Sequence, residues 1–148
     1  MAAPQTGHVG LNVTDLARST AFYQQVLDLE VLGEQVEGDR RYAFLGSDGE
    51  LLLTLWQQSS GEFATDRPGL HHLAFLVADI EAVRAAEERV RAVGAPLFHD
   101  GVVPHGEGAS SGGIFFGDPD GVRLEIYAAH GADVAPAPTA GAPTCGFF

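Results

Sequence analysis

The chain has 148 residues, 45% of them hydrophobic, and its 20 acidic and 8 basic residues give a formal net charge of -12. That charge argues against nucleic acid or an anionic membrane as partner, and no apolar run approaches the roughly 20 residues that cross a bilayer. The single cysteine, Cys145, excludes a disulfide framework and a Cys-rich zinc module. We therefore expect a soluble, cytoplasmic protein of one domain or of two fused half-domains.

The first half of the chain predicts a strand, a helix and further strands. Apolar residues alternate over 9–13, which is the period of a strand. Asp15 is a suitable N-cap for a helix whose apolar residues recur at helical spacing until Gly33 can end the segment. Residues 41–45 and 50–56 are predicted strands joined by a Ser-Asp-Gly turn.

The second half predicts the same order of elements. Residues 73–77 alternate as a strand, Asp79 caps a helix, and Gly94 ends it. The further strands expected are 97–98, 113–116 and 122–128. The two halves also match in sequence: His8–Leu16 resembles His72–Ile80, and Phe44–Leu55 resembles Phe116–Tyr127. Two matched blocks in the same order indicate an internal duplication.

The duplication predicts an α+β fold of two tandem βαβββ modules. The first covers residues 6–60 and the second 69–130, followed by an Ala/Gly/Pro-rich tail, 131–148, whose composition is typical of disorder. A four-stranded sheet with one helix leaves its other face open, so that face must be covered by the twin module, by a ligand or by both.

Strand alternation places three potential metal ligands on the open faces. The large apolar residues of 73–77 point at the helix together with His71, so His72 points to the other side, and the same argument applies to His8. In the last strand Glu125 faces the opening. Two imidazoles and one carboxylate form a site for a first-row divalent metal with open positions, whereas each residue alone would be read as an ordinary core or surface residue.

The first half has no counterpart of Glu125. The equivalent residue is Leu53, or Leu52 or Thr54 if the alignment shifts by one, and none is a carboxylate. The site is therefore expected to have three protein ligands, with the other positions free for water or substrate oxygens. The apolar row beside it would form a hydrophobic cavity wall: Leu51, Leu53 and Leu55.

The loop and the tail of the second half leave alternatives open. Residues 99–113 hold five glycines and should be mobile. They form either a lid, with His105, Glu107 or His99 as acid or base, or an ordinary hairpin loop. The Phe147-Phe148 pair at the end could dock on the body or on a partner chain. We take His105 and Glu125 as the catalytic candidates. Further candidate substrate contacts are Phe115, Arg123, which could instead pair with a neighbouring carboxylate, and Tyr127.

Residues 6–129 resemble the vicinal oxygen chelate superfamily. The resemblance rests on the His-leading strands, the Asp15–Leu29 helix and the Asp118-Pro-Asp-Gly-x-x-x-Glu125 ending. It implies paired βαβββ modules in a curved sheet around a cavity, one divalent ion (Fe, Mn, Zn or Ni) held by His8, His72 and Glu125, a small-molecule substrate with vicinal oxygens, and a homodimer. Some members share the metal between modules of different chains.

Departures from the pattern shape the expected reaction. Glyoxalase I and methylmalonyl-CoA epimerase carry a Glu or Gln where this chain has Leu53. Fosfomycin-resistance enzymes and extradiol dioxygenases use the matching three ligands, but residues 114–116 lack their usual tyrosine. We expect a metal-dependent enzyme with dioxygenase- or transferase-type chemistry. The alternatives are glyoxalase-like lyase or isomerase chemistry, and a bleomycin-resistance-like protein that sequesters a hydrophobic small molecule, such as an antibiotic, without turnover.

Overall fold

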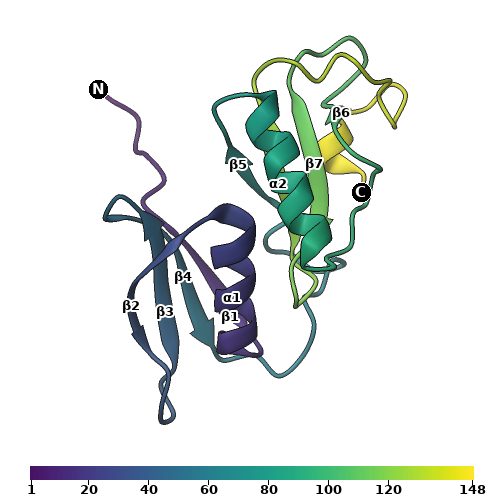
Figure 1. Cartoon of the computed structure of the whole chain (residues 1–148). Coiled ribbons are helices and arrows are strands. Elements are labelled where there is room, and N and C mark those ends of the chain that lie inside the picture. The colour runs from purple at the N-terminus through teal and green to yellow at the C-terminus, as the bar shows by residue number, and fades with distance from the viewer. The chain divides into compact units, whose positions relative to one another are not determined.

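A computed structural model describes residues 1–148, which form two compact units, Met1–Glu62 and Phe63–Phe148. Each unit has the βαβββ order predicted from the sequence, with four strands in one mixed sheet and one helix packed on it (Figure 1). The α+β fold is thus confirmed. No helix in the structure is long and apolar enough to span a bilayer.

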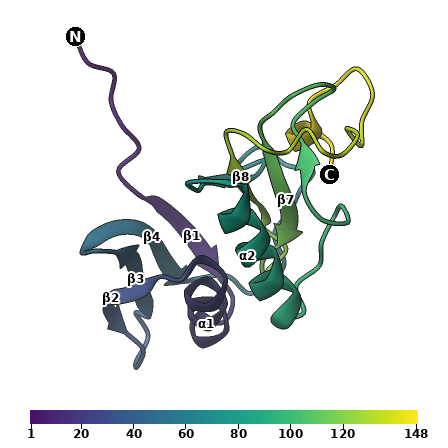
Figure 2. The same ribbon diagram turned by 45° about the horizontal axis from the view of Figure 1, so that its top comes forward.

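The first unit is a sheet of order β1-β4-β3-β2 with one helix. Its elements are β1 (Val9–Val13), α1 (Leu16–Leu27), β2 (Glu30–Gln35), β3 (Tyr42–Ser47) and β4 (Glu50–Gln57). β1 runs parallel to β4, and the other neighbours are antiparallel. Figure 2 looks nearly along α1 and shows the four strands on one side of it. One face of this sheet is therefore covered by α1, and the other carries no element of its own unit.

The helix of the first unit begins as predicted but ends earlier. The Asp15 carboxylate accepts a hydrogen bond from the Arg18 amide at 3.0 Å and caps the helix. The helix ends at Leu27 because Asp28 adopts a left-handed conformation with φ of 55°. Gly33, expected to end the helical segment, instead lies in β2 next to a bulge. The apolar residues after the helix belong to a strand, which short-range periodicity did not distinguish.

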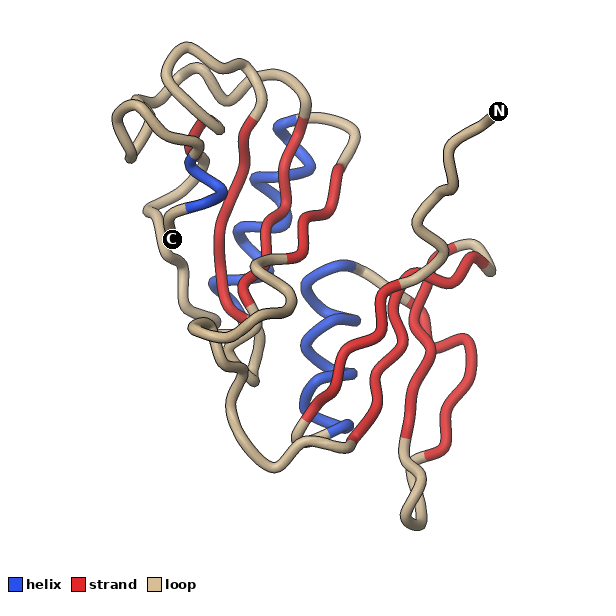
Figure 3. Tube along the Cα trace, turned by 180° about the vertical axis from the view of Figure 1, so that it is seen from behind, coloured by secondary structure: helices blue, strands red, loops and turns tan.

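The second unit repeats this arrangement with a sheet of order β5-β8-β7-β6. Its elements are β5 (Leu73–Leu76), α2 (Ile80–Ala92), β6 (Val103–Pro104), β7 (Gly112–Gly117), β8 (Arg123–Ala128) and a short 3-10 helix, η1 (Thr144–Gly146). Figure 3 shows these strands from behind, with α2 on their far side. The predicted cap and stop of α2 are both confirmed, since Asp79 accepts from the Ala82 amide and Gly94 has a φ of 72°.

The expected strand at 97–98 is wrong. Leu97 makes only an isolated bridge to Phe116, and the edge strand β6 is instead Val103–Pro104. Val103 is 8% exposed, so this part of the glycine-rich segment 99–113 contributes to the core. Pairing of β6 with β7 supplies the backbone hydrogen bonds that hold this segment.

The tail, expected to be disordered, contacts the second unit. The Ala132 amide donates to the Ser110 carbonyl at 2.8 Å, and the Thr144 amide donates to the His105 carbonyl at the same distance. The Thr144 hydroxyl also donates to the Pro104 carbonyl at 2.6 Å. The yellow η1 in Figure 1 accordingly lies beside β6 and β7. Composition alone missed this docking because specific hydrogen bonds and the ring contacts of Phe148 hold the tail, and composition reports neither.

Candidate metal centre

The Asp-Pro-Asp-Gly turn sets the start of β8 and therefore the position of Glu125. The buried Asp118 carboxylate accepts from the amides of Asp120 at 2.9 Å and Val122 at 2.8 Å. Gly121 has a φ of 88°, a conformation that favours glycine. This turn reverses the chain, so that β8 leaves it antiparallel to β7. The motif that carried the family resemblance thus has a structural role next to the site.

Register places the predicted second-module residues on one face. Ala74 of β5 pairs with Glu125, and the contact of the His72 imidazole with the Glu125 carboxylate places His72, which immediately precedes β5, on the same side. Phe115 of β7 pairs with Glu125 from the other side and is fully buried. Glu125 itself is 2% exposed. A buried carboxylate requires polar partners, because an unpaired charge there would be strongly destabilising.

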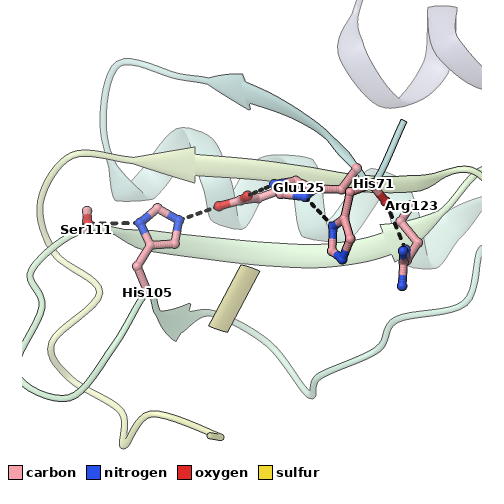
Figure 4. Close-up of polar contacts among 6 residues, drawn as sticks. His71, His105, Ser111, Arg123 and Glu125 are labelled. Atoms are coloured by element: carbon pink, nitrogen blue, oxygen red, sulfur yellow. Dashed lines mark hydrogen bonds and ion pairs between the residues drawn. The ribbon is translucent and has the colours of Figure 1, made fainter. Parts of the chain in front are cut away.

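Two imidazoles supply those partners (Figure 4). His105 Nε2 makes a short hydrogen bond with Glu125 Oε1, and His72 Nε2 lies 3.5 Å from Oε2. His105 Nδ1 is 2.9 Å from the Ser111 hydroxyl oxygen, and the His105 amide donates to the Ser111 carbonyl. Because a carboxylate only accepts, His105 Nε2 donates to it, and a neutral ring would then accept from Ser111 at Nδ1. The structure therefore brings His105 to the predicted centre.

His72 is oriented by its neighbour. His71 Nδ1 and His72 Nδ1 are 2.8 Å apart, and Arg123 Nε donates to the His71 carbonyl at 2.9 Å. This contact at Nδ1 leaves His72 Nε2 directed at Glu125. Burial lowers the pKa of His72, while the Glu125 charge acts in the opposite direction. The neutral ring that burial favours is also the form that binds metals.

Strand alternation predicted that His71 points to the same side as the apolar residues of β5, and this prediction is wrong. β5 begins only at Leu73, so His71 lies outside the strand, and its ring is exposed. Sequence reasoning also missed Ser111, which lies inside the glycine-rich segment. The histidine doublet was the signal that could have identified His71, because the second ring nitrogen of a ligand histidine is usually hydrogen-bonded to a neighbouring group.

The donor atoms of the second unit fit a divalent ion in part. Two ligands at about 2.0–2.2 Å from one metal are roughly 3–3.5 Å apart. The 3.5 Å between His72 Nε2 and Glu125 Oε2 matches that spacing, and it is too long for a good hydrogen bond. No group of three His, Cys, Asp or Glu side chains is arranged to hold a metal ion in this structure. Two donor atoms thus lie at the spacing of two ligands on one ion.

His8 lies in the first unit, exposed and immediately before β1. The sequence repeat makes it the equivalent of His72. In the first unit Gly10 pairs with Thr54, as Ala74 pairs with Glu125 in the second. Thr54 is therefore the counterpart of Glu125, and the alignment to Leu53 is corrected by one residue. The absence of a carboxylate at that position still holds.

The same register corrects the proposed apolar wall. Leu53 and Leu55 pair with Val9 and Leu11 and are fully buried in the core on the α1 side, so they cannot line the open face. Leu51 is half-buried and lies beside a bulge. The open face of this sheet instead carries three aromatic rings whose centroids lie 5.0–5.9 Å apart: Tyr42, Phe44 and Trp56. The Trp56 indole donates to the Thr54 hydroxyl at 2.9 Å.

The remaining candidate residues differ in how close they lie to Glu125. The Tyr127 ring is 5.0 Å from that of His105, so it forms part of the same face. Arg123, two residues before Glu125 on β8, faces the same side, whereas Glu107 is exposed in the loop. The His99 ring packs at 5.6 Å from Phe115, and burial lowers its pKa. Of the loop's acid–base candidates, only His105 contacts the carboxylate.

The model of the Glyoxalase/Bleomycin resistance protein/Dioxygenase superfamily matches residues 5–126. The chain belongs to this superfamily. The resemblance inferred from its motifs is therefore confirmed. The family unites proteins of different chemistry, so membership explains the duplicated fold and leaves the reaction to the residues of the site.

Relatives within the superfamily differ in activity. A catechol-2,3-dioxygenase of Bacillus subtilis is 32% identical over 125 residues, which cover 82% of this chain but only 40% of that protein. A lactoylglutathione lyase of Haemophilus influenzae is 35% identical over 131 residues, covering 80% of this chain and 88% of that protein. A variant of the fosfomycin resistance protein FosX from Listeria monocytogenes has a TM-score of 0.65 and 25% identity, covering 87% of this chain and 94% of that one. That structure contains Mn(II) and 1S,2S-dihydroxypropylphosphonic acid.

Proposed function

We propose that the chain is a divalent-metal-dependent enzyme whose ligands are His8, His72 and Glu125. The observation that carries this proposal is the pair of His72 Nε2 and Glu125 Oε2, separated by the distance of two ligands on one ion. His8 is the third ligand by its equivalence to His72 in the repeat. The Mn(II) in the FosX structure supports a metal in this fold. The ion is Fe, Mn, Zn or Ni, and the assembly is a homodimer.

The substrate is a small molecule with two vicinal oxygens. When bound, the ion supplies Lewis-acid stabilisation of developing negative charge, or a place for dioxygen next to a catechol-like group. His105 holds the Glu125 carboxylate through Nε2, and its partial exposure lets it exchange a proton with a bound substrate. Tyr127 and Phe115 shape the same face, and Arg123 supplies a positive charge on it.

The first unit favours dioxygenase- or transferase-type chemistry over glyoxalase-type chemistry. Thr54 stands where a second carboxylate would serve as fourth ligand and proton carrier, and its hydroxyl is already bonded to the Trp56 indole. The similarity to a catechol-2,3-dioxygenase agrees with this choice. The lactoylglutathione lyase similarity supports the alternative, so rapid isomerisation of a hemithioacetal by the metal-loaded protein would overturn our preference.

Metal analysis of protein purified without chelator tests the ligand set. We expect close to one ion per chain, lost in His8→Ala and Glu125→Ala. Thr54→Val is the matched control, because it changes the counterpart of Glu125 in the other unit and should retain the ion. If His8→Ala keeps the metal and His105→Ala loses it, the third ligand is His105 and the assignment of His8 is wrong. Oxygen uptake with catechol then tests the reaction.

A second candidate function is sequestration of a hydrophobic compound without turnover. The observation in its favour is the half-exposed aromatic cluster of Tyr42, Phe44 and Trp56 on the open face of the first unit. Trp56 is the only tryptophan, so its fluorescence reports on this cluster directly. Tight quenching by an aromatic antibiotic, with no metal bound under any loading condition, would favour the binding protein over the enzyme.

A further inference from the structure

The ring of Phe148 lies on the face of the second sheet that carries the candidate metal centre. Its centroid is 4.7 Å from that of Phe115, 5.5 Å from Phe98 and 5.7 Å from His72. These are the separations of favourable aromatic pairs. Phe115 pairs with Glu125 across the β7–β8 ladder, and His72 contacts the Glu125 carboxylate. The ring of Phe148 is therefore next to the proposed ligands.

An arginine on β8 binds the oxygen end of the same residue. Arg123 Nη1 donates to the backbone oxygen of Phe148 at 3.1 Å, and its guanidinium carbon is 5.8 Å from the centre of the Phe148 ring. Arg123 precedes Glu125 by two residues on β8 and so faces the same side. A guanidinium pairs with a carboxylate more strongly than with a neutral carbonyl. The site thus recognises an aromatic ring and an oxygen joined by a short chain.

The segment that precedes Phe148 in the chain is held on the second unit by few contacts. Hydrogen bonds from Ala132 and Thr144 anchor its two ends. Between them, residues 133–143 are rich in Ala, Pro and Gly, and none of them is buried. A segment with so little buried apolar surface opens at low free-energy cost. The C-terminal end can therefore leave the sheet without unfolding the unit.

We propose that Phe98, Phe115, His72 and Arg123 form an aryl-carboxylate subsite, which the chain fills with its own Phe148 until a ligand displaces it. The ligand class is an aromatic ring with a carboxylate on a short side chain. This proposal rests on the proposed function only for the position of the ligand beside the metal. The subsite itself is tested on metal-free protein. Failure of metal binding and failure of the subsite are therefore separate results.

The first test uses 3-phenylpropanoate, which reproduces the ring and the oxygen of Phe148. Titration calorimetry on metal-free Phe148→Ala should show binding about tenfold tighter than in the wild type, the factor expected if Phe148 is docked nine-tenths of the time. Phe147→Ala is the matched control, because Phe147 is adjacent and 61% exposed. It should bind as the wild type does. Equal affinity in the two variants, or no binding in either, overturns the proposal.

The second test uses Cys145, the only cysteine, which lies part-buried in η1. If the probe displaces the tail, its addition accelerates thiol labelling of Cys145 in the wild type. Binding elsewhere would leave the rate unchanged and overturn the proposal. Arg123→Gln should abolish tight binding of 3-phenylpropanoate, while 3-phenylpropanol should bind weakly to every variant. Retained binding in Arg123→Gln would likewise contradict the assignment of the oxygen end.

Discussion

In the first unit Gly10 of β1 pairs with Thr54 of β4, and in the second Ala74 of β5 pairs with Glu125 of β8. The two sheets share strand order and register, yet their open faces differ. One carries three half-exposed aromatic rings, and the other carries a buried carboxylate between two imidazoles. Duplication therefore preserved strand order, register and the helix-facing core, while the residues of the two open faces diverged.

Substitution of Phe115 and of Phe44 compares how much the open face of each sheet contributes to stability. They occupy equivalent register positions, but Phe115 is fully buried and Phe44 is half-exposed. We expect Phe115→Ala to lower the free energy of unfolding by about 3–5 kcal/mol, the range for a buried phenylalanine. Phe44→Ala should cost about 1 kcal/mol, because it buries less apolar surface. Urea unfolding followed by circular dichroism measures both, and similar losses would mean that the faces are equally packed.

Glu125→Gln tests whether only the second unit supplies a carboxylate for metal binding. The amide keeps the shape of the side chain but loses the charge, so we expect metal affinity to fall about 100-fold or more. That loss exceeds the effect of removing a residue that only hydrogen-bonds to a metal ligand. Thr54→Val removes a polar group at the matching position of the first unit and should leave metal affinity unchanged. Competition with a metal-sensitive dye gives both constants. Equal effects would show that both sheets hold the ion.

His105→Gln separates a supporting residue from a ligand. His105 contacts Glu125 and is itself held by Ser111, so its loss should weaken metal binding about 10- to 100-fold without abolishing it. Ser111→Ala acts one contact further away and should have a smaller effect in the same direction. Complete loss of metal in His105→Gln, with retention in His8→Ala, would make the second unit sufficient by itself.

The smallest expected effect concerns pH. Burial lowers the pKa of His99, whose Nε2 atom has no hydrogen-bond partner. The unfolded chain, with an ordinary pKa of about 6.5, then binds more protons than the folded one below that pH. Stability should therefore decrease as pH falls through 6.5 and below. His99→Leu should show a shallower decrease in urea midpoint between pH 7.5 and 5.5, and an unchanged slope would exclude His99 as its source.

Short-range patterns predicted both helices and their N-caps correctly, but not the end of α1 or every strand. Asp15 and Asp79 both cap as expected, because capping depends only on the local chain. Gly33 was misassigned to the end of a helix, and β6 was placed too early, at 97–98. Short strands depend on partners distant in sequence, so their limits follow from pairing rather than from composition.

The sequence by itself determined the duplication, the βαβββ order and the candidacy of His72 and Glu125, because these follow from repeated blocks and strand alternation. Only the tertiary structure decided register, which moved the counterpart of Glu125 from Leu53 to Thr54. It also brought His105 to the carboxylate and Phe148 onto the same face. These contacts join segments that are far apart in the chain. They consist of hydrogen bonds and ring packing, which leave no periodic pattern in the sequence.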